Sequence, residues 1–192
     1  MTSAIRIPLI LLALLFGMAQ AHADDDYADT IAVFKGAGES SDFFKKSYGY
    51  AVFPTIGKGG IGIGGAYGKG RVYKQGGYVG DTSMTQLTVG FQLGGQAYSQ
   101  IIFFEDKRAF DEFTGGNFEF GAQATAVAIT AGASAQTSTT GSSAGASGGQ
   151  HDAKTKDIGG YYKGMAVFSV AKGGLMFEAS LGGQKFSYTP KK

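Results

Sequence analysis

The chain has 192 residues, of which 33 are glycine and none is cysteine, and its formal net charge at pH 7 is +2. The absence of cysteine excludes disulfides and thiolate metal ligands, and the near-neutral charge argues against a general nucleic-acid binder. The glycines follow no collagen period and alternate with Ile, Val, Phe and Tyr, so we expect many short, curved strands rather than disorder.

The first 23 residues have the features of a secretory signal peptide. Arg6 gives a positive start, residues 7–16 are almost entirely apolar, and Ala21-His22-Ala23 is a small-x-small cleavage site. The apolar stretch is too short to span a bilayer. We therefore expect an exported, periplasmic protein, peripheral to a membrane at most, with one domain over 24–192. The alternative is an N-terminal anchor that is never cleaved.

Helical signals come first in the mature chain. Tyr27, Ile31 and Phe34 lie at helical spacing, which predicts an amphipathic helix over 26–36 that ends at the glycines 36 and 38. Ser41 is placed to cap a second short helix that carries Phe43 and Phe44.

A period of two begins at Tyr50. Residues 51–53 are a short apolar run that we expect to stop at Pro54, and residues 60–67 alternate as a strand. Gly68-Lys69-Gly70 predicts a hairpin turn into a strand over 71–74, and Gly76-Gly77 predicts the next turn.

The remaining segments follow the same logic. Residues 85–94 alternate with Leu87, Val89, Phe91 and Leu93 on one face, and residues 99–104 form another strand. Asp106 is placed to cap a helix through Phe113. Residues 118–136 are predicted to form one long or two short strands, with a helix as the minor alternative because of their alanine content. A flexible Ser/Gly/Ala/Thr-rich insert is expected at about 137–156, and strands over 165–170 and 175–181.

One motif occurs twice. Gly49-Tyr-Ala-Val-Phe53 recurs as Gly164-Met-Ala-Val-Phe168, and Lys58-Gly-Gly recurs as Lys172-Gly-Gly. Either this is a coincidence in a glycine-rich chain, or two equivalent units pack with pseudo-twofold symmetry. The predicted fold class is therefore mainly β with short helices (α+β), as a curved antiparallel sheet or open barrel.

The sequence offers few residues that could support catalysis. His22 leaves with the signal peptide, so His151, beside the flexible insert, is the single histidine of the mature chain. No Cys–His pair or zinc cluster can form, and a Ser-His-Asp triad would have to use His151. Residues 60–65 match G-x-G-x-x-G, but a strand and not a helix follows, so the match is weak. We expect no enzyme, no cofactor, no metal and no bound nucleotide.

Several motifs in order carry a family resemblance. Tyr50-Ala-Val-Phe-Pro54, the run 58–70, Thr88-Val-Gly-Phe-Gln-Leu-Gly94 and Ser180-Leu-Gly-Gly183 together resemble the SYLF (Ysc84-like) domain. The resemblance covers nearly all of the mature chain except the insert. It implies a lipid-binding domain, since eukaryotic members bind phosphoinositides through an amphipathic N-terminal segment and basic residues, and some bind actin. For an exported bacterial member it implies anionic phospholipids or lipid phosphates.

Cations and aromatic residues cluster where a lipid site is expected. Membrane surfaces attract cations to their headgroups and aromatic side chains to their interface. We predict that headgroup phosphates are bound by a basic hairpin with two supporting lysines: Lys58, Lys69, Arg71, Lys74, Lys45 and Lys46. The expected interface aromatics are Phe43, Phe44, Tyr67 and Tyr73.

Other interpretations remain open at this point. The aromatic residues can equally be core, with lysines that keep edge strands soluble. A structural or interaction protein of the cell envelope, bound to a protein partner, is the main functional alternative. A small outer-membrane β-barrel is a weaker one, because several expected strands are shorter than a bilayer requires.

Overall fold

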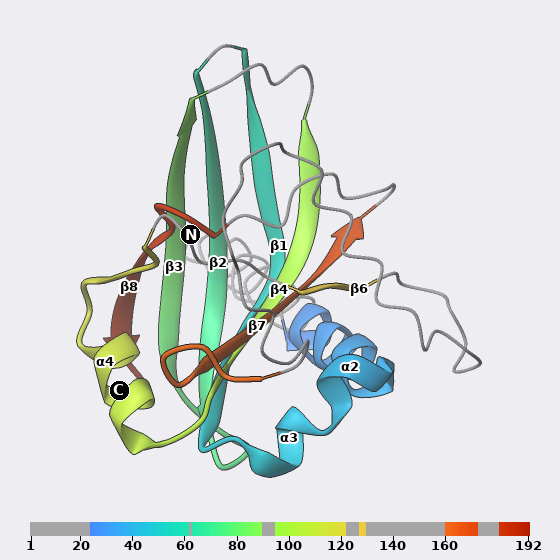
Figure 1. The fold of residues 1–192 in the computed structure, drawn as a ribbon, viewed down its shortest axis with the longest axis vertical. Coiled ribbons are helices and arrows are strands. Elements are labelled where there is room, and N and C mark those ends of the chain that lie inside the picture. The colour runs from blue at the N-terminus through green and yellow to red at the C-terminus, as the bar shows by residue number, and fades with distance from the viewer. Residues whose placement is uncertain (1–23, 62, 90–94, 122–126, 130–159, 173–180) are drawn as a thin grey trace, which may run out of the picture.

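A computed structural model describes residues 24–61, 63–89, 95–121, 127–129, 160–172 and 181–192 (Figure 1). The described strands form one eight-stranded sheet in the order β5-β8-β3-β2-β1-β4-β7-β6. Neighbouring strands are antiparallel except β6 and β7, which are parallel. The sheet curls into a half-barrel, which confirms the expected curved, mainly β fold with short helices.

The four long strands β1 to β4 form the middle of the sheet, and shorter strands extend it on both sides. The strands are β1 (Gly49–Ile61), β2 (Ile63–Lys74), β3 (Gly77–Val89), β4 (Gln96–Phe104), β5 (Phe118–Glu119), β6 (Val127–Ile129), β7 (Met165–Lys172) and β8 (Lys185–Pro190). The helices are one over 24–36, then α2 (Gly38–Ser41), α3 (Phe43–Lys46) and α4 (Lys107–Thr114).

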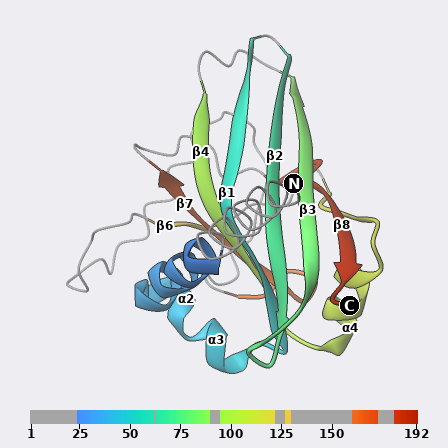
Figure 2. The same ribbon diagram turned by 180° about the vertical axis from the view of Figure 1, so that it is seen from behind.

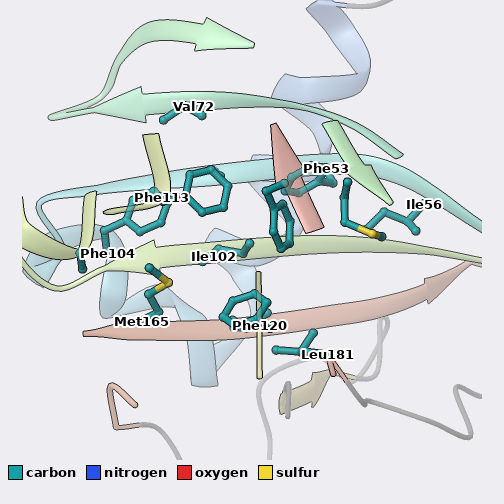
Figure 3. Close-up of a cluster of buried hydrophobic side chains, with 14 of the residues drawn as sticks. Phe53, Ile56, Val72, Ile102, Phe104, Phe113, Phe120, Met165 and Leu181 are labelled. Carbon is teal, nitrogen blue, oxygen red and sulfur yellow. The ribbon is translucent and has the colours of Figure 1, made fainter. Parts of the chain in front are cut away.

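Two layers of apolar side chains cover the two faces of the sheet. We call the inner face the one on which α4 packs. Phe53, Phe104 and Phe113 lie in its core, and Figure 3 shows these side chains gathered over the strands. Because neighbouring residues of a strand point to opposite faces, Val52 and Phe103 lie on the outer face.

The N-terminal helices cover part of the outer face. Phe34 of the first helix and Phe43 of α3 are buried against Phe103 and Phe168, and Tyr27 and Ile31 are packed against the same cluster at the helical spacing predicted for them. Figures 1 and 2 place these helices at the lower end of the long strands, while the β1–β2 hairpin lies at the opposite end. Among the described residues, helices therefore cover the lower half of the outer face and leave its upper half uncovered.

Pro54 does not end a strand as predicted. It lies inside β1, where the register shifts by one residue against both neighbouring strands, between Val52 and Thr55 on one side and between Phe53 and Ile56 on the other. Proline has no N–H for the sheet ladder and is tolerated at such a bulge. The extra residue reverses the alternation of β1, so that Thr55 pairs with Lys69 on the outer face while Ile56 is buried on the inner face.

The predicted turn at Gly68-Lys69-Gly70 is also wrong, because these residues lie in the middle of β2. A Cβ added to Gly70 would come within 2.6 Å of the Phe53 ring and 2.8 Å of the Val52 carbonyl oxygen. The glycines therefore allow a close approach of β2 to the side chains and backbone of β1, and they do not bend the chain. The hairpin from β1 to β2 is made instead between Ile61 and Ile63.

The β2–β3 turn is confirmed, one residue earlier than predicted. Gln75 and Gly76 have φ angles of 50° and 82°, the left-handed conformation that tight two-residue hairpins require. The strand that was predicted over 85–94 begins at Gly77, and residues 90–94 lie outside the described residues.

The helix predictions are mostly confirmed. Asp106 caps α4, since its carboxylate accepts a hydrogen bond of 2.8 Å from the backbone N–H of Ala109. Ser41 is not a cap as predicted: it is the last residue of α2, and Asp42 precedes α3 without a side-chain cap bond.

The repeated motifs occupy comparable places. Gly49–Phe53 in β1 and 164–168 at the start of β7 flank β4, and both pair antiparallel with its C-terminal half. Their matching residues face opposite sides, since Phe53 is in the inner core and Phe168 in the outer one. For 118–136 the structure has two short strands, β5 and β6, which is one of the predicted alternatives. The predicted insert and most of the predicted strand over 175–181 lie outside the described residues.

Candidate functional site on the outer face

The predicted cations are spread over the molecule and do not form one site. Lys69 and Arg71 are on the outer face of β2, whereas Lys58 pairs with the inward-facing Ala66 near the β1–β2 hairpin. Lys74 is at the other end of β2, with its ammonium 5.2 Å from the centre of the Tyr48 ring. Lys45 and Lys46 are exposed on α3, where Lys46 is 3.9 Å from Asp42.

Arg71 is engaged within the protein. Its guanidinium lies 4.4 Å from the Tyr27 ring centre and 5.1 Å from that of Tyr78, and it forms an ion pair of 2.5 Å with Asp24. Partial burial alone would lower the pKa of Arg71, but the hydrogen bond and the charge of Asp24 raise it above its usual value. Arg71 therefore anchors the first helix to the sheet.

Three of the four predicted interface aromatics belong to the core. Phe43 is buried, with its ring centroid 5.0 Å from that of Phe168, and Phe44 packs edge-on against Phe103 at 4.9 Å. Tyr73 stacks on Tyr50 with centroids 5.0 Å apart. Phe43 therefore lies in the outer core, and Phe44 and Tyr73 are partly buried against it.

Tyr67 differs, because it lies on the uncovered upper half of the outer face. Its side chain is 51% exposed, and it has two apolar neighbours, Ile63 at 73% and Leu87 at 83%. Leu87 pairs with Gly65, which lies between Ile63 and Tyr67 along β2. The glycine leaves room beside Leu87, so the three side chains, which we call the apolar trio, are neighbours on one face.

Lysines and hydroxyls lie just below the apolar trio. Lys69 is the next outward residue of β2 after Tyr67, about 7 Å further along the strand. Lys172 of β7 donates a hydrogen bond of 2.7 Å from Nζ to the Thr55 hydroxyl. Lys185 of β8 pairs with Thr85, the cross-strand partner of Tyr67, and its ammonium is 3.5 Å from Glu119.

Sequence reasoning missed four residues of this surface: Ile63, Leu87, Thr55 and Lys172. Signals for two of them were present. A proline inside a strand pattern indicates a bulge, which would have placed Thr55 outward. Lys172 is the counterpart of Lys58 in the repeated Lys-Gly-Gly motif. Nothing local marks Ile63 or Leu87 as exposed, because their exposure depends on where the helices pack.

Within the described ranges, no three or more His, Asp or Glu side chains are grouped closely enough to hold a metal ion. Nor does the described part of the chain contain a helix with the length and apolarity needed to cross a membrane. The distinctive feature of the outer face is therefore the combination of exposed apolar side chains with cations.

Comparison with known proteins agrees with this architecture. The family model Ysc84, described as "Las17-binding protein actin regulator", matches residues 85–191, which is more than half of the chain. The chain belongs to the Ysc84 family. The matched segment includes β4, α4, β7 and β8, together with the second of the two repeated motifs.

A curated relative supports the Ysc84 assignment. The chain is 31% identical over 170 residues to Beta cell expansion factor A of Aeromonas veronii. The aligned region is 83% of this chain and 53% of that protein, so the chain spans about half the length of this relative.

Proposed function

We propose that this Ysc84-family protein binds anionic membrane surfaces peripherally, through the upper half of its outer face, as a non-enzymatic protein of the periplasm. The apolar trio carries the proposal. Three exposed apolar side chains lie together on the sheet face: Ile63, Tyr67 and Leu87. Lys69 is the next outward residue of β2 after Tyr67, and Lys172 reaches Thr55, the cross-strand partner of Lys69. Side chains of this kind enter the interface of a bilayer while lysines contact the headgroups.

The charges near the apolar trio support the proposal. Lys69 and Lys172 form no ion pair with a carboxylate among the described residues, in contrast to Lys107, which is bound to Asp111, and Lys185, which is near Glu119. Each lysine near an anionic surface contributes about 1 kcal/mol. Membership of a family associated with lipid binding points the same way.

Binding through the apolar trio can be tested by co-sedimentation with liposomes. We expect residues 24–192 to sediment with anionic but not with neutral vesicles, and less at high salt, because screening weakens attraction to a charged surface. The double substitution Ile63→Ser/Leu87→Ser should weaken sedimentation at least tenfold, since it removes two apolar side chains from the interface.

Val33→Ser is the matched control, because Val33 is 46% exposed on the first helix, away from the apolar trio. Its binding should equal that of the wild type. Loss of binding in Val33→Ser without loss in Ile63→Ser/Leu87→Ser would move the contact to the N-terminal helix. Absence of binding to any vesicle would overturn the proposal and make a protein partner the better explanation of the apolar trio.

A further inference from the structure

The bulge at Pro54 creates an arrangement that the strand pattern alone would not give. It turns Thr55 to the outer face, directly opposite Lys69 of β2. From the other side, Lys172 reaches across β4 and donates to the same hydroxyl at 2.7 Å, although it is 117 residues away in the chain. One hydroxyl is thus flanked by two lysines from two different strands.

No carboxylate of the described ranges offsets the charges of this group. Among the described residues, neither Lys69 nor Lys172 is within ion-pair distance of a carboxylate. The nearest outward acid in register is Asp81, which pairs across the strands with Arg71, two residues from Lys69. Ser83, the other cross-strand neighbour of Lys69, shares a hydrogen bond of 2.7 Å with Ser187 and brings hydroxyls rather than charge.

We propose that Lys69, Thr55 and Lys172 bind the phosphate group of a lipid headgroup. A phosphate offers several oxygens and a charge that complements two ammonium groups. The Thr55 hydroxyl accepts from Lys172 and still has its own proton to donate to a phosphate oxygen. The bulge holds the hydroxyl in place, so one of the donors is positioned before binding.

The location of Lys69, Thr55 and Lys172 beside the apolar trio favours a lipid phosphate over free phosphate as the ligand. Tyr67 is the next outward residue after Lys69, and the rest of the apolar trio lies beyond it, toward the β1–β2 hairpin. A headgroup phosphate held at Thr55 would therefore have its acyl chains beside exposed apolar side chains. This inference rests on the proposed function and specifies where the headgroup binds.

The test compares phosphate with another anion at equal surface charge. Binding is measured to phosphatidylcholine vesicles that contain either phosphatidic acid or oleic acid, matched for surface potential. We expect the wild type to bind the phosphatidic acid vesicles more tightly. Lys69→Gln/Lys172→Gln should lose about 25-fold in affinity for them, at about fivefold per lysine. Lys45→Gln/Lys46→Gln, with the same change of charge on α3, should lose much less.

Substitution of Thr55 distinguishes binding of phosphate at a formed site from general electrostatic attraction to an anionic surface. Thr55→Val keeps a β-branched side chain in the strand but removes the hydroxyl, and it should abolish the preference for phosphatidic acid while binding to oleate vesicles is unchanged. Thr55→Ser should retain the preference. Circular dichroism of each variant checks that the sheet is intact.

Three results would contradict the proposed phosphate site, and each would lead to a different conclusion. Equal binding of the wild type to both vesicles would leave membrane binding in place but remove the phosphate site. Calorimetric binding of inorganic phosphate as tight as that of vesicles would assign the site to free phosphate. No binding to either vesicle would overturn the proposed function together with this inference.

Discussion

Tyr27 and Tyr50 show how single side chains hold the N-terminal helices to the sheet. Both are half-buried in the outer core, and burial raises the pKa of each phenol to about 12. For Tyr27 the nearby Arg71 acts in the opposite direction and Asp81 adds to the increase. These phenols are therefore packed as neutral groups, and the attachment of the helices depends on their remaining so.

The stability of the fold should consequently depend on alkaline pH. Because the pKa of both phenols is higher in the folded chain than the ordinary value of 10.0, the folded chain holds these protons more tightly than the unfolded chain. Their contribution is fully present below pH 10, and the free energy of unfolding should fall between about pH 10 and about pH 12. Urea unfolding at a series of pH values measures this decrease.

The control for the pH effect is substitution of the phenols. Tyr27→Phe/Tyr50→Phe should reduce the decrease, because phenylalanine cannot ionise. Tyr162→Phe, which changes a tyrosine that is 61% exposed, should leave it as in the wild type. A decrease that is undiminished in the double variant would assign the effect to other groups.

At the scale of elements, local patterns predicted most of the secondary structure. The helical spacing of Tyr27, Ile31 and Phe34 and the cap at Asp106 were sufficient to place two helices. The errors came from residues whose role is set by a neighbouring strand. Gly68 and Gly70 resemble turn residues in sequence, and Pro54 resembles a strand end, but contacts of β2 with β1 and the bulge determine their conformation.

Two glycines in adjacent strands test this explanation. Gly70→Ala should destabilise the fold by about 1–3 kcal/mol, since its Cβ would overlap the Phe53 ring and the Val52 carbonyl. Gly57→Ala should be neutral or slightly stabilising, because a Cβ at that position meets nothing within 4 Å. Thermal unfolding compares the two variants, and similar melting temperatures for both would contradict the close approach of β1 and β2.

At the scale of the molecule, the strand order could not be predicted from the sequence. β8 pairs with β3, and β7 pairs with β4, across long stretches of chain that carry no local signal for either pairing. The candidate site depends on these pairings, since they bring Lys185 beside Thr85 and Lys172 beside Thr55. Lys69 and Tyr67 are predicted site residues that also lie on the surface that we propose as the site, but their neighbours there were found only in the fold.

The orientation of the whole protein on a membrane tests the central claim most directly. The chain has no cysteine, so Ile63→Cys, Leu87→Cys, Val33→Cys and Lys46→Cys each give a single attachment point for an environment-sensitive fluorophore. With anionic vesicles we predict a blue shift for labels at positions 63 and 87 and none at 33 and 46. Shifts at 33 or 46 without shifts at 63 and 87 would show that the N-terminal helices, and not the upper outer face, contact the membrane.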